Sequence, residues 1–157
     1  MDIKNYLRDN GVEFEVHTHP ARFTAQEVAA AEHVPGRMLA KVVIIQADRR
    51  FVMAVLPATQ LVDIDKLASV LGADDVRLAE EYEMRNLFPD CETGAEPPFG
   101  NLYDIELLVD RQLAMQDHIV FQSGTHRETV RMKYADYDRL ARPKVADFAA
   151  PAEAPVR

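Results

Sequence analysis

One lysine interrupts an otherwise apolar run, and it is the residue in this chain best placed for chemistry. Lys41 follows Leu39-Ala40 and precedes Val42-Val43-Ile44-Ile45. A strand this apolar is expected to be covered on both faces, and burying an unpaired ammonium costs several kcal/mol. Lys41 therefore either opens into a cleft, where its charge could hold an anion, or extends from the strand end into solvent. Taken alone, this pattern does not decide between these two positions of the Lys41 ammonium.

A stiff loop is the second candidate. Gly94-Ala95-Glu96-Pro97-Pro98-Phe99-Gly100 combines two prolines, which fix φ and lack an N–H, with two glycines, which allow unusual backbone angles. Such a loop, called here the Gly94–Gly100 loop, can present main-chain N–H and C=O groups to a ligand at low entropic cost. A rigid connector that binds nothing is the alternative.

Histidine and cysteine side chains supply the remaining candidates. His126 follows Gly124-Thr125 and could position a hydroxyl or phosphate or shuttle a proton, or it could be a surface turn residue. His17 and His19 would face the same way on a strand, as metal ligands could. No third ligand follows at a characteristic spacing, so packing at the strand end is preferred. Cys91 has no sequence-adjacent base that would activate it as a nucleophile.

Composition and missing motifs narrow the function classes. The sequence has no P-loop, G-x-G-x-x-G, H-E-x-x-H or G-x-S-x-G signature. A net charge of −8 disfavours extended nucleic-acid contact, because Lys and Arg contacts to phosphate dominate affinity, but it is compatible with binding a short RNA end. A single cysteine excludes an internal disulfide. Since neither a signal peptide nor an apolar stretch of about 20 residues is present, we expect a cytosolic protein with no membrane contact.

The elements that must position these residues alternate between helices and strands. Helices are expected over 2–10, from the capping box that begins at Thr24 to about 32, from 63 or 65 to 71, over 79–88 and over 134–141. Strands are expected over 12–16, 38–46, 51–56, 76–78, 107–109, 118–121 and 129–132. The short links favour an α+β fold with a mixed, largely antiparallel central sheet surrounded by helices. The Ala/Pro-rich end predicts one domain over 1–148 and a flexible tail over 149–157.

The ordered set of motifs resembles the YbaK/aminoacyl-tRNA synthetase-associated domain family. The resemblance is carried by the apolar strand with its single lysine, the Gly-x-x-x-Pro loop and Gly124-Thr125-His126, together with His17-Thr18-His19-Pro20 and Thr24-Ala25-Gln26-Glu27. It covers roughly residues 5 to 148. The family includes the editing insertion of bacterial prolyl-tRNA synthetases and free-standing deacylases.

This resemblance implies a fold like the prolyl-tRNA synthetase editing domain and a trans-editing deacylase. Such an enzyme hydrolyses the ester between an amino acid and the 3′-terminal adenosine of mischarged tRNA, here of the tRNA(Pro) type, without a metal, another cofactor or a covalent protein nucleophile. The implied partners are the aminoacylated tRNA acceptor end and a synthetase such as prolyl-tRNA synthetase. A catalytically silent module that binds a synthetase or an aminoacylated RNA end is the alternative, and a metal-dependent hydrolase that uses the histidines is the third reading.

The resemblance also assigns residues to roles. Lys41 and His126 are expected to be catalytic. The residues expected to contact the substrate lie in the Gly94–Gly100 loop, in the turn before His126 and at the start of the second helix: Gly94, Pro98, Phe99, Gly100, Gly124, Thr125 and Thr24.

Overall fold

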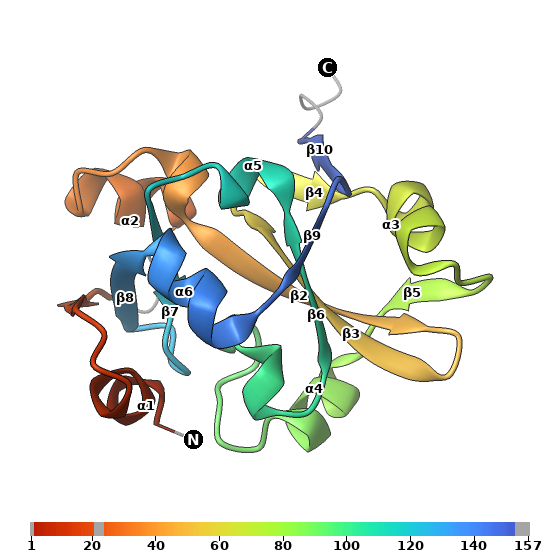
Figure 1. Ribbon diagram of the computed structural model, residues 1–157, viewed down its shortest axis with the longest axis horizontal. Coiled ribbons are helices and arrows are strands. Elements are labelled where there is room, and N and C mark those ends of the chain that lie inside the picture. Colours follow the sequence, from red (N-terminus) through yellow and green to blue (C-terminus); the bar gives the residue numbers. More distant parts are fainter. Residues whose placement is uncertain (1, 21–23, 153–157) are drawn as a thin grey trace.

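The largest unit of the fold is a five-stranded mixed sheet. The computed structural model describes residues 2–20 and 24–152 (Figure 1). The sheet has the order β5-β2-β3-β6-β9. Its strands are β2 (Ala40–Ala47), β3 (Arg50–Pro57), β5 (Val76–Leu78), β6 (Glu106–Asp110) and β9 (Lys144–Ala146). β2 pairs antiparallel with β3 and β5, whereas β6 lies parallel to β3 and β9.

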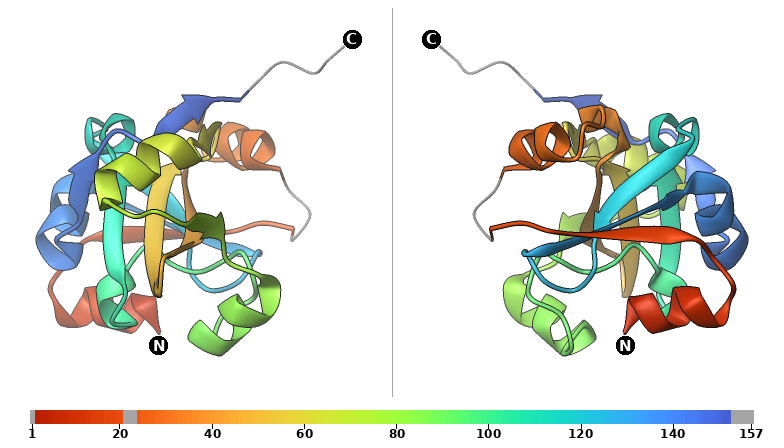
Figure 2. Two further views of the ribbon diagram at one scale, coloured as in Figure 1. Left: turned by 90° about the vertical axis from the view of Figure 1, so that its right-hand side faces the viewer. Right: turned by 90° about the vertical axis from the view of Figure 1, so that its left-hand side faces the viewer.

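A second sheet supplies the other side of the site. The antiparallel strands β1 (Phe14–Thr18), β8 (Glu128–Lys133) and β7 (His118–Gln122) form it in that order. These strands run across those of the larger sheet (Figure 2). A single parallel bridge between Leu39 and Val120 joins the two sheets, and a short ribbon pairs β4 (Gln60–Val62) with β10 (Ala149–Pro151).

In the part of the chain that the structure describes, six α-helices surround the sheets (Figure 1). They are α1 (Ile3–Asp9), α2 (Ala25–Ala31), α3 (Ile64–Leu71), α4 (Glu81–Leu87), α5 (Arg111–Ala114) and α6 (Tyr134–Ala141). Capping residues determine where α2 and α3 begin and end. Thr24 and Glu27 form the expected capping box at the start of α2. At the start of α3 the side chain of Asp63 accepts the N–H of Lys66, and Gly72 ends this helix with a left-handed backbone conformation. Within the described part of the chain, every helix is too short or too polar to span a lipid bilayer.

Both faces of the central hairpin are buried. Alternate side chains enter different clusters: Ile44 and Met53 pack with Phe99 and Tyr137, whereas Ile45 and Val52 pack on the other face. Ile44 is 2% exposed and Ile45 is fully buried. The expectation that the strand bearing Lys41 is covered on both faces is therefore confirmed at Ile44 and Ile45, whereas residues 40–43 are only part-buried. The α+β class is confirmed, and antiparallel pairing predominates over the described sheets taken together, with two parallel pairings in the central one.

The chain end departs from the expected tail. Ala149–Pro151 form β10, so the prediction of a flexible tail over 149–157 is wrong for its first three residues. The buried carboxylate of Asp110 explains this, because its Oδ1 accepts the N–H of Phe148 at 3.0 Å and that of Ala149 at 2.9 Å. Phe148 is fully buried. Residues 153–157 lie outside the described residues.

Candidate active site

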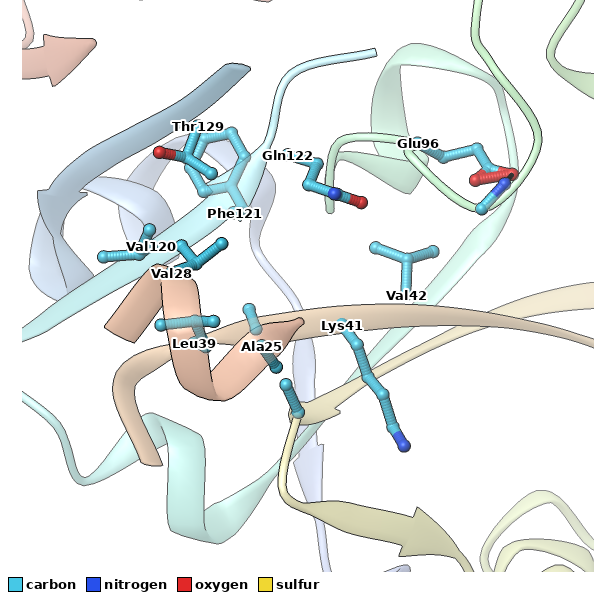
Figure 3. Close-up of a pocket in the computed structure, with 13 residues that line it drawn as sticks. Ala25, Val28, Leu39, Lys41, Val42, Glu96, Val120, Phe121, Gln122 and Thr129 are labelled. Carbon is cyan, nitrogen blue, oxygen red and sulfur yellow. Dashed lines mark hydrogen bonds between the residues drawn. The ribbon is translucent and has the colours of Figure 1, made fainter. Parts of the chain in front are cut away.

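A cavity of about 230 Å³ lies where the two sheets meet. Its walls come from β2, β7, β8, the start of α2 and the Gly94–Gly100 loop (Figure 3). The lining residues are Ala25, Val28, Leu39, Ala40, Lys41, Val42, Ala58, Gly94, Glu96, Val120, Phe121, Gln122 and Thr129. The wall is mostly apolar, with four polar side chains placed around it. This is the composition typical of a pocket that binds a small molecule.

Lys41 reaches this cavity from β2. Its side chain is half-buried, and no described residue forms a hydrogen bond or ion pair with its ammonium. Burial lowers the pKa of Lys41 below its ordinary value, because the charged form is poorly solvated there. Side chains alternate along a strand, so Val42 faces Glu96 and Gln122, whereas the ammonium points away from them (Figure 3). An unpaired, half-buried cation at the edge of a pocket is suited to hold an anionic ligand.

The exposed start of the Gly94–Gly100 loop forms another wall. Gly94 has φ +90°, a conformation that strains other residues, and it lines the cavity. Its N–H donates to Oε1 of Glu96 at 3.0 Å. Glu96 is only 2% exposed, and its Oε2 has no hydrogen-bond partner among the described residues. Burial raises the pKa of Glu96 above its ordinary value.

The far end of the loop enters the core. Phe99 is fully buried, with its ring centroid 5.1 Å from that of Tyr137. The hydroxyl of Tyr137 donates to the carbonyl oxygen of Pro98 at 2.6 Å. A Cβ on Gly100 would lie 2.8 Å from the carbonyl oxygen of Ile105, so only glycine fits. Pro98, Phe99 and Gly100, which the sequence suggested as substrate contacts, thus lie outside the cavity lining and anchor the loop.

The turn that carries His126 is tied to the same loop. Gly124 donates its N–H to the carbonyl oxygen of Ala95 and accepts the N–H of Glu92, both at 2.8 Å. The carboxylate of Glu92 accepts the N–H of His126 at 2.6 Å. A Cβ on Gly94 would lie 3.5 Å from Cε1 of His126. The structure therefore brings Lys41, Gly94 and His126 to one site, with His126 behind Gly94.

Two further sequence candidates support the pocket from outside. Thr125 is exposed, and its hydroxyl accepts the N–H of Arg127 at 3.3 Å. Thr24 caps α2 and thereby positions Ala25 and Val28 of the pocket wall. Neither threonine lines the cavity.

Gln122 is a site residue that sequence reasoning missed. It ends β7, and its carboxamide extends toward the Glu96 and Val42 side of the pocket (Figure 3). Its Nε2 lies 3.4 Å from Nδ1 of His126. A polar residue at the end of an apolar strand, four positions before His126, was the only available signal.

The His-x-His pair belongs to a buried polar network beside the pocket. His19 Nε2 lies 2.8 Å from Oε2 of Glu32, which also accepts the Thr129 hydroxyl at 2.7 Å. His17 Nε2 lies 3.7 Å from the other Glu32 oxygen. Among residues 2–20 and 24–152, no group of three His, Cys, Asp or Glu side chains is arranged to hold a metal ion. The network links β1, β8 and the end of α2 around the pocket-lining Thr129.

Cys91 is an unfavourable nucleophile. Its Sγ lies 3.4 Å from the hydroxyl of Tyr103. Burial raises the pKa of the Cys91 thiol, so the reactive thiolate is disfavoured. It does not line the cavity.

Comparison with known proteins places the chain in a known class. The sequence profile of the aminoacyl-tRNA editing domain matches residues 19–140. The chain therefore belongs to the aminoacyl-tRNA editing domain family, and the prediction of an aminoacyl-tRNA deacylase with trans-editing function is confirmed at the level of this class.

Individual relatives agree with this membership. The chain is similar to the multifunctional Ser/Thr-tRNA deacylase ProXp-y of Escherichia coli K12, with 31% identity over 90% of this chain and 87% of the relative. It also matches the proline–tRNA ligase of Thiobacillus denitrificans, with 34% identity over 68% of this chain and 18% of the ligase. A solved structure described as a candidate trans-editing enzyme for prolyl tRNA synthetase has the same fold, with TM-score 0.84, 22% identity and 94% of each chain covered.

Proposed function

We propose that the cavity beside Lys41 and Gly94 is the site where this deacylase removes a small amino acid from mischarged tRNA. The observation that carries the proposal is the half-buried ammonium of Lys41, which has no acidic partner within residues 2–20 and 24–152 and belongs to a residue lining the same cavity as Gly94. At about 230 Å³, the cavity is smaller than the ~300–1,000 Å³ typical of larger ligands. It suits the aminoacyl group, and the nucleotide then lies at its mouth.

The reaction in this proposal is direct hydrolysis. The oxygen of a water molecule attacks the ester carbonyl carbon, the bond to the ribose oxygen breaks, and that oxygen leaves with a proton. The products are the free amino acid and the uncharged tRNA. Because the ester is already activated, orientation and stabilisation of developing negative charge can supply the rate enhancement. Lys41 holds an anionic oxygen of the terminal nucleotide, and the main chain at Gly94 orients the aminoacyl group.

The mechanism proposed here uses no covalent enzyme intermediate. Cys91 is hydrogen-bonded to Tyr103, and burial raises its thiol pKa. Among the described residues that line the cavity, Thr129 is the only serine, threonine or cysteine, and its hydroxyl donates to Glu32. Water is the nucleophile that remains consistent with this lining.

For the substrate, we propose small amino acids attached to tRNA(Pro)-type acceptors. The E. coli relative is named for seryl and threonyl substrates, and the ligase relatives are proline–tRNA ligases. A net charge of −8 favours a small footprint limited to the acceptor end. Binding to a prolyl-tRNA synthetase would add the missing RNA contacts, and the cytoplasm, where charged tRNA is used, is the proposed location.

A panel of mischarged tRNAs tests this proposal. The purified chain is incubated with alanyl-, cysteinyl-, seryl- and threonyl-tRNA, and loss of the aminoacyl group is compared with spontaneous hydrolysis. We expect accelerated loss of at least one small amino acid. Binding without acceleration of any of them would identify the chain as a silent binding module.

A further inference from the structure

The carboxamide of Gln122 is a polar group of the pocket that the hydrolysis scheme leaves unused. Its Nε2 lies 3.4 Å from Nδ1 of His126, whereas its Oε1 has no hydrogen-bond partner among the described residues. The side chain extends into the space on the Glu96 and Val42 side of the pocket (Figure 3). Gln122 therefore offers an acceptor to a ligand.

The main chain determines which end of this amide faces the pocket. Nε2 of His126 lies 2.9 Å from the carbonyl oxygen of Thr93. A carbonyl oxygen only accepts hydrogen bonds, so Nε2 carries the proton. In the neutral ring Nδ1 then carries a lone pair and must accept. The NH₂ group of Gln122 consequently faces His126, and Oε1 faces the pocket.

Polar groups are segregated across the pocket. The Lys41 ammonium points away from Gln122 and Glu96 (Figure 3). On the opposite side lie the Gln122 oxygen and, buried behind the N–H of Gly94, the carboxyl group of Glu96. A ligand that matches this arrangement carries an anion at one end and a cationic hydrogen-bond donor at the other. An aminoacyl nucleotide has these features, with phosphate at one end and the α-ammonium group at the other.

We propose that Gln122 binds the α-ammonium group of the aminoacyl moiety through Oε1, and that His126 is the positioning residue that keeps this oxygen turned toward the pocket. The inference rests on the proposed deacylase function and adds the residue that recognises the amino end of the substrate. The apolar groups of Val28, Val120 and Phe121 then surround the amino acid side chain. An aminoacyl group whose amino group is acylated has no charge there and places an acyl group against the Gln122 oxygen. We therefore expect the pocket to bind such a ligand weakly.

Binding of an uncleavable analogue tests this inference directly. The probe is 3′-deoxy-3′-(L-serylamino)adenosine, which carries an amide in place of the ester, and its partner is the N-acetylated form. Affinities are measured by calorimetry with the full chain at about pH 7, where an α-amino group is mostly protonated. The wild type should bind the free amine about tenfold more tightly or better, as expected for a hydrogen bond to a charged group.

Three substitutions separate recognition from a structural effect. Gln122→Met keeps the length of the side chain and should lower affinity for the free amine about tenfold, with no change for the N-acetyl form. Gln122→Glu restores an acceptor and should keep or increase the preference for the free amine. Gln112→Met makes the same chemical change as the first variant at an exposed position of α5 and should alter neither affinity. Circular dichroism verifies that each variant is folded.

The outcomes distinguish this inference from the proposed function. Equal binding of both analogues by the wild type, binding of neither, or an unchanged preference in Gln122→Met would overturn the α-ammonium site. Unchanged analogue affinities with a lowered kcat on seryl-tRNA would assign Gln122 to the attacking water and also overturn it. Preference for the free-amine analogue without hydrolysis of any aminoacyl-tRNA would instead contradict the deacylase.

Discussion

His126 donates a hydrogen bond from Nε2 to the carbonyl oxygen of Thr93 at 2.9 Å. With Gln122 at Nδ1, both ring nitrogens are engaged within the protein. Of the roles that the sequence left open for His126, positioning is therefore the one we propose, and proton shuttling is not. The ring holds the Gln122 amide and packs behind Gly94, so its effect on the substrate is indirect.

Replacing His126 with Gln should give a moderate loss. We expect kcat/KM for seryl-tRNA to fall about tenfold, because a general base or acid is worth ~10²–10⁴-fold and a positioning group less. A decrease above about 100-fold in a folded protein would show that His126 acts as a general acid or base.

Glu96→Gln should stabilise the protein at neutral pH. Burial raises the pKa of Glu96, so between its unfolded and folded pKa values the folded state binds more protons than the unfolded state. Wild-type stability therefore falls as pH rises through this interval. Glutamine still accepts the Gly94 N–H and carries no charge, so we expect a gain of about 1 kcal/mol in unfolding free energy at pH 7.

The pH dependence of the stability gain in Glu96→Gln serves as a control for this prediction. Below the ordinary pKa of about 4.3 the carboxyl is neutral in both states, and the gain should disappear there. Glu81→Gln removes a charge at an exposed position of α4 and should have little effect at either pH. Lower stability of Glu96→Gln at pH 7, measured by urea denaturation, would mean that the ionised carboxylate has a stabilising partner.

Much of the fold could be predicted because local signals and tertiary structure agree. The capping box at Thr24, the Asp63 cap and Gly72 each act within one turn of their helix, so no distant partner is needed. The hairpin of β2 and β3 follows from two apolar runs and a short turn. Strand β10 lacked such a signal. It forms because Asp110, far away in sequence, accepts two main-chain N–H groups there.

Residues of the candidate site could be predicted only where their type is unusual among their sequence neighbours. Lys41 is conspicuous as a charge within an apolar strand, and Gly94 as the start of a Gly/Pro loop. Gln122 is an ordinary residue at the end of a strand, and its orientation depends on Thr93, which lies on a different loop. Phe99 and Gly100 share the unusual loop with Gly94, but core packing determines their environment, and the sequence pattern does not distinguish them.

Cys91→Ser should retain deacylation within about twofold of the wild type. The thiol is hydrogen-bonded to Tyr103, and its raised pKa disfavours the thiolate that covalent catalysis needs. Serine can keep the contact to Tyr103. Complete loss of hydrolysis in a folded Cys91→Ser protein would bring back a covalent mechanism.

Gly94→Ala should reduce kcat/KM for every mischarged tRNA alike, by about tenfold. The new Cβ would contact His126 at an ordinary 3.5 Å, so the damage comes from the strained φ of +90° and from the methyl group beside the substrate. Because the main chain recognises groups that all amino acids share, the ranking of alanyl-, cysteinyl- and seryl-tRNA should not change. Loss of one substrate with the others spared would mean that Gly94 takes part in side-chain discrimination.

Lys41 provides the most direct test of the account, because the proposed site depends on its unpaired ammonium. The measurement is the single-turnover rate of seryl-tRNA hydrolysis by the wild type, Lys41→Ala and Lys41→Met, with Lys66→Ala as an exposed control on α3. We predict a decrease of at least about 100-fold for both Lys41 variants, the scale of losing one electrostatic stabiliser, and wild-type rates for Lys66→Ala. Both Lys41 variants should be at least as stable as the wild type, since a half-buried cation is removed. A folded Lys41→Ala protein that hydrolyses seryl-tRNA at the wild-type rate would contradict the account.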